Sequence, residues 1–444
     1  MKLIQYHQIQ NFAARTHHQQ NRPPYTTATT TTTTIPKDHS RCSPYVVVAT
    51  FFISLLFILS LLSTSTSQLL TIRRDPALFP NRPVSLATVP YGPTPPSIAY
   101  LISGSAGDSG RILRLLFASY HPRNQYLLHL DLSAPQTERD RLAVNVLSVP
   151  IFRAAQNVDV IGKSNYAYRR GSSTISSTLH GASILLRLSS NWDWFIALNA
   201  GDYPLITQDD LLHILSYLPK NLNFVNHSSY IDWKESKRLK PIIVDTGHYL
   251  LEKDEVFYVT QKRLLPNAFK LFSGSRFTML TRAFIEFCIL GTDNLPRTLL
   301  MYLANMPYPF ANYFPTILCN TDKFKRTVIN HSLQYVTSNI SSSKKPSSIN
   351  SAEFDAMVWS GDAFATEFQF DDPVLDRIDQ KVLKRKRDRV VPGGWCLGVP
   401  KNDTCSVWGD ADILRPGPGA KRLEKRIVGL LSDVRFRSQQ CPDE

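Results

Sequence analysis

The sequence predicts an α/β protein built on a largely parallel sheet with helices on its flanks. From 97 to 218, short apolar runs alternate with stretches whose apolar residues recur at helical spacing, the pattern of a doubly wound sheet. The 444 residues are 43% hydrophobic and include 23 Phe, which is enough apolar material for a large core. We therefore expect one large folded domain at 97–435.

The expected strands and helices follow one another in this order. A strand at 97–103 leads through a Gly/Ser loop into a helix at 111–120, and a second strand at 124–131 ends in Asp131. The alternation continues with strands at 158–161 and 194–198 and with helices at 172–188, 209–218, 281–290, 295–305 and 422–431. The C-terminal third also carries a basic helix end at 381–389 and a Gly/Pro-rich loop at 392–419.

The strand at 194–198 is the feature around which the rest is organised. It ends in Asn199-Ala200-Gly201-Asp202, where small residues let a ligand approach the backbone and a carboxylate follows the strand. Open α/β sheets bind ligands at this end, although a core strand followed by an ordinary turn is the alternative. The Gly-rich loop at 103–110 lacks the spacing of a phosphate-binding loop or a dinucleotide fingerprint. It is therefore either a nucleotide contact or a tight turn.

The N-terminal part of the chain predicts a membrane anchor. Residues 1–44 are rich in Gln, His and Thr, and we expect them to form a disordered cytosolic tail. Residues 45–63 hold an uncharged apolar run that is just long enough to span a bilayer, the alternative being a buried helix. Lys and Arg precede this run, which predicts a type II protein with a Ser/Thr/Pro-rich stem at 64–96 and a lumenal domain.

Cysteines and glycosylation sequons agree with an oxidising lumen. Asn-x-Ser/Thr sequons predict N-glycosylation at Asn226, Asn330, Asn339 and Asn402. Cys396 and Cys405 flank a short loop and are expected to form a disulfide, with Cys288 and Cys319 as a candidate second pair. No second Cys/His pair completes a zinc site, so no metal is expected. The net charge of +14 comes without a nucleic-acid-binding motif, which favours a nucleotide-type substrate over DNA or RNA.

A series of motifs runs through the expected domain from 98 to about 430. They include Tyr-Arg-Arg-Gly at 168–171, the strand and turn at 192–212, Asp-Asn-Leu-Pro-Arg at 293–297, Tyr-Phe at 313–314 and Trp-Gly-Asp at 408–410. In this order they resemble the core-2/I-branching glycosyltransferase family, and specifically its plant β-glucuronosyltransferase branch. The resemblance covers nearly the whole expected domain, which makes it far more specific than any single motif.

The resemblance implies a GT-A-like, Rossmann-like fold in the Golgi membrane. It also implies inverting transfer of glucuronic acid from UDP-glucuronic acid to galactan chains of arabinogalactan proteins. Inversion needs a general base on the acceptor hydroxyl while UDP leaves from the opposite face. Characterised animal members resemble a metal-free variant, in which Lys and Arg neutralise the leaving diphosphate, so no cofactor is expected. Asp410-Ala411-Asp412 is formally an Asp-x-Asp motif, and we interpret it as structural.

Two departures from the family pattern bear on activity. Alignment on Tyr313-Phe314 puts Ala311 where the family has its catalytic Glu, and a methyl group cannot accept a proton. The family's Phe-Ala-x-Lys-Phe motif, whose Lys contacts the diphosphate, here carries Glu367, and this carboxylate would repel the diphosphate. Glu235 is the candidate replacement base, with plain surface charge as its alternative.

The resemblance also assigns the remaining site residues. Donor binding is expected from Ser103, Asp131, Arg170, Asn199, Asp202, Lys344 and Lys345, and acceptor binding from Trp233, Glu235, Arg238, Ser273 and Gly274. Two hypotheses follow. The chain is either an active UDP-sugar-dependent glycosyltransferase, or a catalytically impaired member that serves as a lumenal binding or scaffold partner of an active paralogue.

Overall fold

The chain divides into two compact units, Met1–Ile72 and Arg73–Glu444, and all the residues described below belong to the second. The computed structural model describes residues 74–80, 93–229, 233–252, 256–336, 351–399, 404–432, 434, 436, 440 and 441. The predicted tail, the predicted anchor at 45–63 and most of the predicted stem therefore lie outside the described residues. Within the described part of the chain, no helix is both long and apolar enough to cross a membrane.

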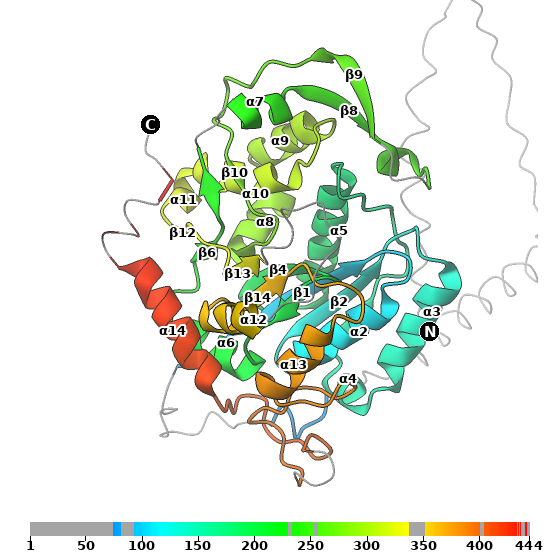
Figure 1. Cartoon of the computed structure of the whole chain (residues 1–444), viewed down its shortest axis with the longest axis vertical. Helices are drawn as coiled ribbons and strands as arrows, with labels where there is room; N and C mark the ends of the chain where they lie inside the picture. Colours follow the sequence, from blue (N-terminus) through cyan, green and yellow to red (C-terminus); the bar gives the residue numbers. More distant parts are fainter. Residues whose placement is uncertain are drawn as a thin grey trace, which may run out of the picture. The chain divides into compact units, whose positions relative to one another are not determined.

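A seven-stranded sheet forms the centre of the domain (Figure 1). Its strand order is β12-β6-β11-β4-β1-β2-β3, and β11 alone runs antiparallel to its neighbours within this sheet of described residues. The strands are β1 (Ile98–Gly104), β2 (Gln125–Leu130), β3 (Val158–Val160), β4 (Trp194–Asn199), β6 (Asn223–Phe224), β11 (Met279–Thr281) and β12 (Val328–Ile329). The predicted α/β fold with a mainly parallel sheet is confirmed.

Side chains of β1 alternate between two hydrophobic cores, one on each face of the sheet. Tyr100 and Ile102 pack into the first core and Ala99 and Leu101 into the second, as the two-residue period of a strand requires. Because both faces are covered by helices, the two central strands are apolar up to their carboxyl ends, from Ile98 to Ile102 in β1 and from Trp194 to Leu198 in β4. The first core is covered by α2 (Ser109–Ala118), α3 (Gln136–Ser148), α4 (Pro150–Ala155), α6 (Gln208–Ser216), α12 (Ser351–Trp359), α13 (Pro373–Lys381) and α14 (Pro418–Leu431). The second is covered by α5 (Ser173–Leu188), α8 (Arg282–Leu290), α9 (Leu295–Leu303) and α10 (Phe310–Cys319).

The strand order reverses next to β1. The chain lays down β1, β2 and β3 from the centre outward, then returns through α5 to place β4 on the other side of β1. A reversal of this kind separates the connections above the two central strands and opens a crevice at their carboxyl ends.

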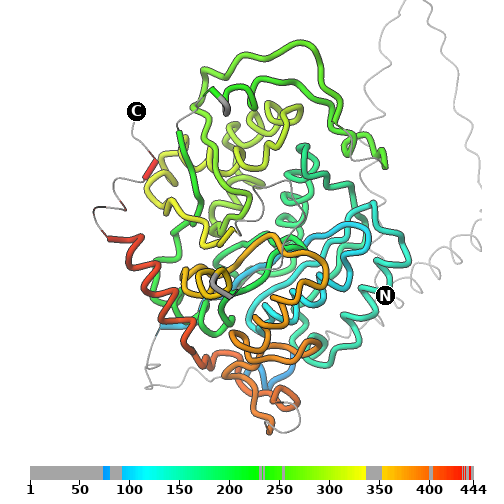
Figure 2. Tube along the Cα trace, in the orientation of Figure 1, coloured from blue at the N-terminus to red at the C-terminus, as the bar shows by residue number. Residues whose placement is uncertain are grey.

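A second sheet of three strands closes one side of that crevice. β14 (Phe364–Thr366) lies between β13 (Gln334–Val336) and β5 (Tyr203–Pro204), with Ala365 opposite Tyr203. Figure 2 shows the segment that carries β14 and α13, in orange, returning beside the N-terminal α2. There Arg114 of α2 bonds Asp376 at 2.7 Å and Asp379 at 2.8 Å, which holds α13 against the domain.

The remaining elements lie on the other flank of the domain (Figure 1). They are the paired strands β7 (His227–Ser228) and β10 (Ser273–Gly274), the hairpin of β8 (Pro241–Asp245) and β9 (Val256–Lys262), the helices α7 (Trp233–Leu239) and α11 (Asp322–Lys325), and the 3₁₀ helix η1 (Thr246–Tyr249).

The structure corrects the predicted stem. Leu78 lies within the predicted 64–96 segment, yet it is 0% exposed and belongs to the first core. Asp75 donates its backbone N–H to the Ala154 carbonyl, and its side chain accepts a hydrogen bond from the Trp408 indole at 3.1 Å. Residues 74–80 are therefore part of the folded domain, because Leu78 is buried in the first core and Phe79 packs against it.

The predicted pairing of Cys288 with Cys319 is wrong. Cys319 is bonded to Cys441, 122 residues further along, with the two Cα atoms 5.2 Å apart, and Cys288 carries a free thiol. The predicted disulfide between Cys396 and Cys405 is formed. Local spacing predicts a short loop well, whereas a long-range pairing depends on the positions of Cβ atoms that sequence separation does not give.

Candidate active site

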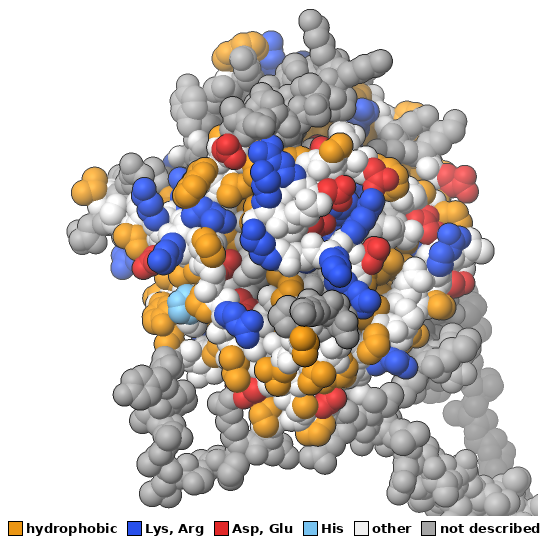
Figure 3. All heavy atoms as spheres, turned by 60° about the horizontal axis from the view of Figure 1, so that its bottom comes forward, with side chains coloured by type: hydrophobic (Ala, Val, Ile, Leu, Met, Phe, Trp, Pro, Cys, Tyr) orange, Lys and Arg blue, Asp and Glu red, His pale blue; other side chains and the backbone are white. Residues whose placement is uncertain are grey.

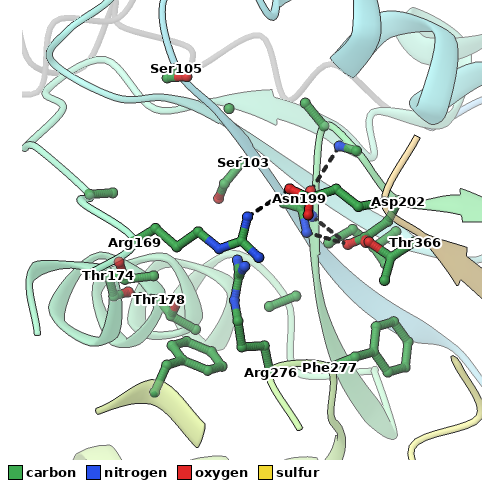
Figure 4. A pocket seen from close by; sticks show the side chains of 18 of the residues that line it. Ser103, Ser105, Arg169, Thr174, Thr178, Asn199, Asp202, Arg276, Phe277 and Thr366 are labelled. Carbon is green, nitrogen blue, oxygen red and sulfur yellow. Dashed lines mark hydrogen bonds and ion pairs between the residues drawn. The ribbon is translucent and has the colours of Figure 1, made fainter. Parts of the chain in front are cut away.

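A cavity of about 440 Å³ lies at the carboxyl ends of β1, β2 and β4 (Figure 4). Its walls are residues 103–105 after β1, Asp131 after β2 and residues 197–202 of β4 and the following turn. The lining also includes Asp108 and Arg111 at the start of α2, Ala167 and Arg169 before α5, helix α5 itself, the segment 275–277 after β10, the start of α10, the strands β13 and β14, and Glu367. The cavity thus occupies the crevice that the reversal of strand order opens.

The turn after β4 is held by its own side chains. Asp202 accepts hydrogen bonds from the backbone N–H of Asn199 at 2.8 Å and from its side-chain amide at 2.9 Å. The Asn199 side-chain oxygen Oδ1 in turn accepts from the N–H of Gly201 at 2.8 Å, and Gln334 of β13 donates to the other Asp202 oxygen at 3.2 Å. Asp202 therefore closes the turn and ties it to the second sheet while it lines the cavity.

Burial changes the acidity of Asp202. The pKa of its carboxyl is raised to about 6, chiefly because burial disfavours the charged form. Hydrogen bonds from Thr366 and Asn199 and the charge of Arg276 oppose this shift, and the charge of Glu367 adds to it.

Two arginines that sequence reasoning missed, Arg169 and Arg276, extend into the cavity, and Figure 4 shows their guanidinium groups side by side. Arg169 Nη1 lies 2.7 Å from Glu367 Oε1, whereas Arg276 makes no hydrogen bond or ion pair with any residue that the structure describes. Desolvation and the Arg169 charge lower the pKa of Arg276, and Asp202 and Glu367 raise it; a guanidinium nevertheless stays protonated at neutral pH. Two neighbouring cations, one of them without a partner among the described residues, form a site for an anion such as a diphosphate.

The loop after β1 is both a tight turn and a wall of the cavity. Asp108 accepts hydrogen bonds from the N–H of Ser105 at 3.0 Å and from Arg111 at 2.9 Å, and Gly107 adopts the left-handed φ of +87° that the turn needs. Arg111 also donates to the Phe368 carbonyl at 2.8 Å. The charges of Asp108 and Arg111 are thus used within the protein, and 103–105 face the cavity.

Asp131 anchors the loop after β2 in the same way. Its carboxylate accepts hydrogen bonds from the backbone N–H of Ser133 at 3.0 Å, from the Ser133 hydroxyl and from the N–H of Ala167 at 3.4 Å. Burial raises its pKa, and these hydrogen bonds act against the shift. The predicted donor residues Ser103, Asp131, Asn199 and Asp202 therefore all line one cavity.

The Core-2/I-Branching enzyme family model matches residues 98–358, which is more than half of the chain. The chain belongs to the Core-2/I-branching enzyme family. It is 48% identical over 351 residues to beta-glucuronosyltransferase GlcAT14A of Arabidopsis thaliana, covering 79% of this chain and 78% of the relative. It is 43% identical over 406 residues to GlcAT14C of the same plant, covering 91% and 98%.

A more distant relative is named a xylosyltransferase. Human xylosyltransferase 1 is 27% identical over 241 residues, covering 53% of this chain and 23% of the relative. The solved structure of the bifunctional glycosyltransferase WbbM matches with a TM-score of 0.33 and 11% identity, covering 68% of this chain and 52% of that one, which is too weak a likeness to argue from. From the family model and the closely similar relatives, this Core-2/I-branching enzyme is a glycosyltransferase.

Several predicted donor and acceptor residues of this Core-2/I-branching enzyme lie outside the cavity lining. Arg170 is exposed, and its carbonyl accepts from the N–H of Tyr308 at 2.8 Å. Ser273 and Gly274 form β10, where a Cβ on Gly274 would lie 1.9 Å from the Asn226 carbonyl oxygen. Glycine is required for this close approach, which delivers the next residues, Ser275 and Arg276, to the cavity.

Helix α7 carries the other predicted acceptor residues. Trp233 is 64% exposed with the Lys237 ammonium 4.5 Å from its ring, and Arg238 donates to the Asn312 side chain at 2.8 Å and to the Pro307 and Tyr308 carbonyls. Arg238 therefore joins α7 to the start of α10. The Glu235 side chain, Lys344 and Lys345 lie outside the described residues, so their predicted roles stay predictions.

Ala311, at the predicted position of the lost base, is the second residue of α10. It is partly exposed and directly follows Phe310, which lines the cavity. The Asp410-Ala411-Asp412 stretch does not contribute to the cavity lining. Ala411 is buried, and Asp412 forms an ion pair with Arg123, which agrees with the structural interpretation.

The sequons differ in what surrounds them. Asn226 is exposed, whereas the Asn330 amide exchanges two hydrogen bonds with the backbone of His227, at 2.8 and 2.9 Å. Asn339 and Asn402 lie outside the described residues. Glycosylation at the four sites stays a prediction.

Sequence reasoning found the residues that directly follow a strand and missed those that the fold delivers from elsewhere. Arg169 lies in the Tyr-Arg-Arg-Gly motif next to the predicted donor residue Arg170, and Arg276 lies two residues after the predicted acceptor residue Gly274. The motifs therefore indicate segments that reach the cavity, but Arg is so common on surfaces that no local signal distinguishes the side chains that turn inward.

Proposed function

We propose that this Core-2/I-branching enzyme transfers glucuronic acid from UDP-glucuronic acid to galactan chains of arabinogalactan proteins, with inversion, in the Golgi lumen. The names of the Arabidopsis relatives support the donor sugar. The observation that carries the proposal is the pair Arg169 and Arg276 in a cavity at the carboxyl ends of parallel strands.

The two guanidinium groups would hold the donor diphosphate. As the bond from the sugar to UDP breaks, negative charge grows on the phosphate oxygens, and cations already in place stabilise it. Arg276 has no partner in the described part of the chain that the ligand would have to replace, whereas Arg169 must first exchange Glu367 for the ligand. Asn199 and Asp202 would shape the floor beneath the donor, since their turn is fixed by hydrogen bonds on both sides.

The acceptor hydroxyl needs a base, and Ala311 cannot serve. The four acidic residues that line the cavity are Asp108, Asp131, Asp202 and Glu367, and each already accepts hydrogen bonds or an ion pair from the protein. Glu235 of α7 is therefore our candidate base. No metal is invoked in this mechanism, in keeping with the metal-free expectation.

A second function is favoured by a specific observation. A carboxylate, Glu367, is paired with one of the two cavity arginines, and a methyl group occupies the expected position of the base. Both changes weaken catalysis more than they weaken binding of a nucleotide or glycan. A lumenal binding partner for an active paralogue is therefore the competing proposal.

Turnover of UDP-glucuronic acid on β-galactan by the full chain decides between the two functions. An active enzyme releases UDP, keeps its rate in EDTA and loses it in Glu235→Ala. A binding partner releases no UDP until Ala311→Glu and Glu367→Lys are combined. Turnover that needs added divalent metal would contradict the metal-free mechanism.

Affinity for UDP tests the arginine pair separately from chemistry. Glu367→Gln frees Arg169, so we expect UDP to bind about 3- to 10-fold more tightly by calorimetry, with a larger gain at low salt. Glu286→Gln is the matched control, because Glu286 forms a similar 2.8 Å ion pair with Arg282 on α8, away from the cavity. Equal gains in both variants, or none in Glu367→Gln, would show that the pair does not contact the donor.

A further inference from the structure

A second hollow of about 600 Å³ lies between the end of α12 and the length of α14. None of its lining residues lines the active cavity. We call it the α14 groove and define it by Trp359, Ser360, Pro418, Lys421, Arg422, Lys425, Arg426, Gly429 and Leu430. A volume of this size lies in the range of small-molecule sites and fits a short oligosaccharide.

Four cations line one side of the groove. Lys421 and Lys425, like Arg422 and Arg426, are four residues apart on α14, so each pair shares a helix face. Like charges at this spacing repel and destabilise a helix unless an anion lies between them. Figure 3 turns the bottom of the molecule in Figure 1 toward the viewer. Lys and Arg side chains are spread over this face, with exposed hydrophobic side chains between them.

The protein neutralises the groove only in part. Arg426 lies 3.4 Å from Asp362 and 2.6 Å from the His331 ring, and Arg422 reaches the Leu205 carbonyl at 3.5 Å. The Arg422 Nε atom is buried without a hydrogen-bond partner among the described residues, whereas the Arg426 Nε atom is the one that faces Asp362. No ion pair is formed by Lys421 or Lys425 within the described part of the chain. The groove therefore has capacity for the negative charge of a ligand.

An exposed aromatic ring stands beside these cations. Trp359, at the end of α12, is 74% exposed, and the Arg422 guanidinium lies 6.0 Å from its ring centre. An indole face packs against the C–H face of a pyranose ring, and cations beside it bind carboxylates on the same sugar. A hollow with both features fits an acidic sugar chain better than a lone phosphate, which needs no ring, or a membrane, which needs a protruding surface.

We propose that the α14 groove is a second glycan site, which binds an acidic oligosaccharide. Trp359 packs against a pyranose ring, while Lys421, Lys425 and the two arginines bind uronate carboxylates. The choice of uronate rests on the proposed function, because a galactan that has received glucuronic acid carries such groups. The groove would thus hold the modified part of a chain while the active cavity acts on another part.

Calorimetry on the full chain tests the groove, with β-galactan oligosaccharides that carry glucuronic acid and with the same oligosaccharides without it. We expect Lys421→Glu with Lys425→Glu to weaken binding of the acidic ligand at least about tenfold and to leave UDP affinity unchanged. Trp359→Ala should weaken the binding of both the acidic and the uncharged oligosaccharide. Lys381→Glu is the matched control, because Lys381 is an exposed cation at the end of α13 outside the groove, and it should change neither.

Several outcomes would overturn the proposal. Unchanged affinity for the acidic ligand in both groove variants would do so. The proposal would also be overturned if the groove variants lost binding to phosphatidylserine vesicles while their glycan affinity stayed unchanged, since the groove would then contact a membrane. If the double Glu variant has a lower Tm, Lys421→Gln with Lys425→Gln replaces it, and the same tenfold criterion applies. If the groove variants weaken glycan binding but the parent protein shows no turnover, the catalytic proposal is refuted and the groove proposal stands. If the parent shows turnover but the groove variants bind glycan as the parent does, the groove proposal is refuted and the catalytic proposal stands.

Discussion

A few charged residues set the charge of the active cavity, and they differ in whether the protein itself pairs them. Arg111 is paired with Asp108 and Arg169 with Glu367, while Arg276 makes no pair with a described residue. The first ligand charge to enter therefore meets Arg276 directly, and a second must displace Glu367 from Arg169. Glu367 thereby tunes affinity, because an anionic ligand competes with a carboxylate of the protein itself.

Asp202 makes the stability of the protein depend on pH. Its folded pKa of about 6 lies above the ordinary 3.8, so the folded state holds the proton more tightly, and stability is lost as pH rises from about 4 to 6. In Asp202→Asn this titration is absent. We expect the free energy of unfolding of the variant, relative to the parent, to rise by roughly 2–3 kcal/mol between pH 4 and 7.

Urea unfolding of both proteins at each pH measures this difference. Buried His129 and His331, whose pKa values fall to about 4 because burial disfavours the charged ring, give the opposite dependence. They are present in both proteins and cancel. A difference that stays constant over this range would contradict a raised pKa at Asp202.

At the scale of residues, what could be predicted depended on how local the signal was. Asn199 and Asp202 directly follow an apolar strand, so their place at the ligand-binding end followed from the strand itself. The ion pair of Arg169 and Glu367 joins positions 198 residues apart, and the sequence around either residue does not predict its partner. Folding alone decides such a contact.

Among the elements, α10 links the cavity to the C-terminal segment. Its first residue, Phe310, lines the cavity, and its last, Cys319, is bonded to Cys441. The helix is buried along most of its length in the second core. Fixing its far end therefore also fixes the end that faces the ligand.

Removal of this disulfide should cost stability without affecting the fold of the sheet. Cys441→Ser opens a loop of 122 residues, and loop-closure entropy predicts a loss of about 2–5 kcal/mol in urea unfolding under oxidising conditions. Cys288→Ser is the control and should retain both disulfides, as mass spectrometry after partial digestion would show. A disulfide that contains Cys288 in the parent protein would contradict the observed pairing.

Elements with a strong internal period were predicted well. Strand β4 and helices α5 and α8 start and end within about two residues of their expected positions, because apolar spacing alone defines them. Helix α3 was not predicted, since its sequence is mostly polar and it buries only Leu142 and Val146. Its place depends on α4 and β3, which sequence spacing does not reveal.

At the scale of the whole molecule, the domain begins earlier than its first strand. Leu78 fills the first core from a segment that precedes β1 by twenty residues, and the Ala411 N–H donates to its carbonyl at 3.0 Å. Residues near both ends of the domain thus meet at one place. The N-terminal boundary at 97 that composition suggested cuts through this contact.

Two truncations test this boundary. A chain that starts at Arg73 should keep the stability of the full chain, whereas one that starts at 97 should lose at least about 2 kcal/mol, the cost of emptying a buried leucine site. Leu78→Ala in the full chain should account for most of that loss. Leu147→Ala is the control, because Leu147 is 65% exposed and should change the free energy of unfolding by less than about 0.5 kcal/mol. Equal stability of the two truncated chains would place Leu78 outside the core.

The bond between Cys319 and Cys441 also imposes an order on biosynthesis. A ribosome adds about 5–20 residues per second, so the partner of Cys319 is made on the order of ten seconds after it. During that interval Cys319 lacks its partner, while Cys288, which packs against the same core in the folded protein, has already been synthesised. The bond between Cys319 and Cys441 therefore forms late, and if Cys319 is oxidised before Cys441 is made, the thiol available to it is that of Cys288.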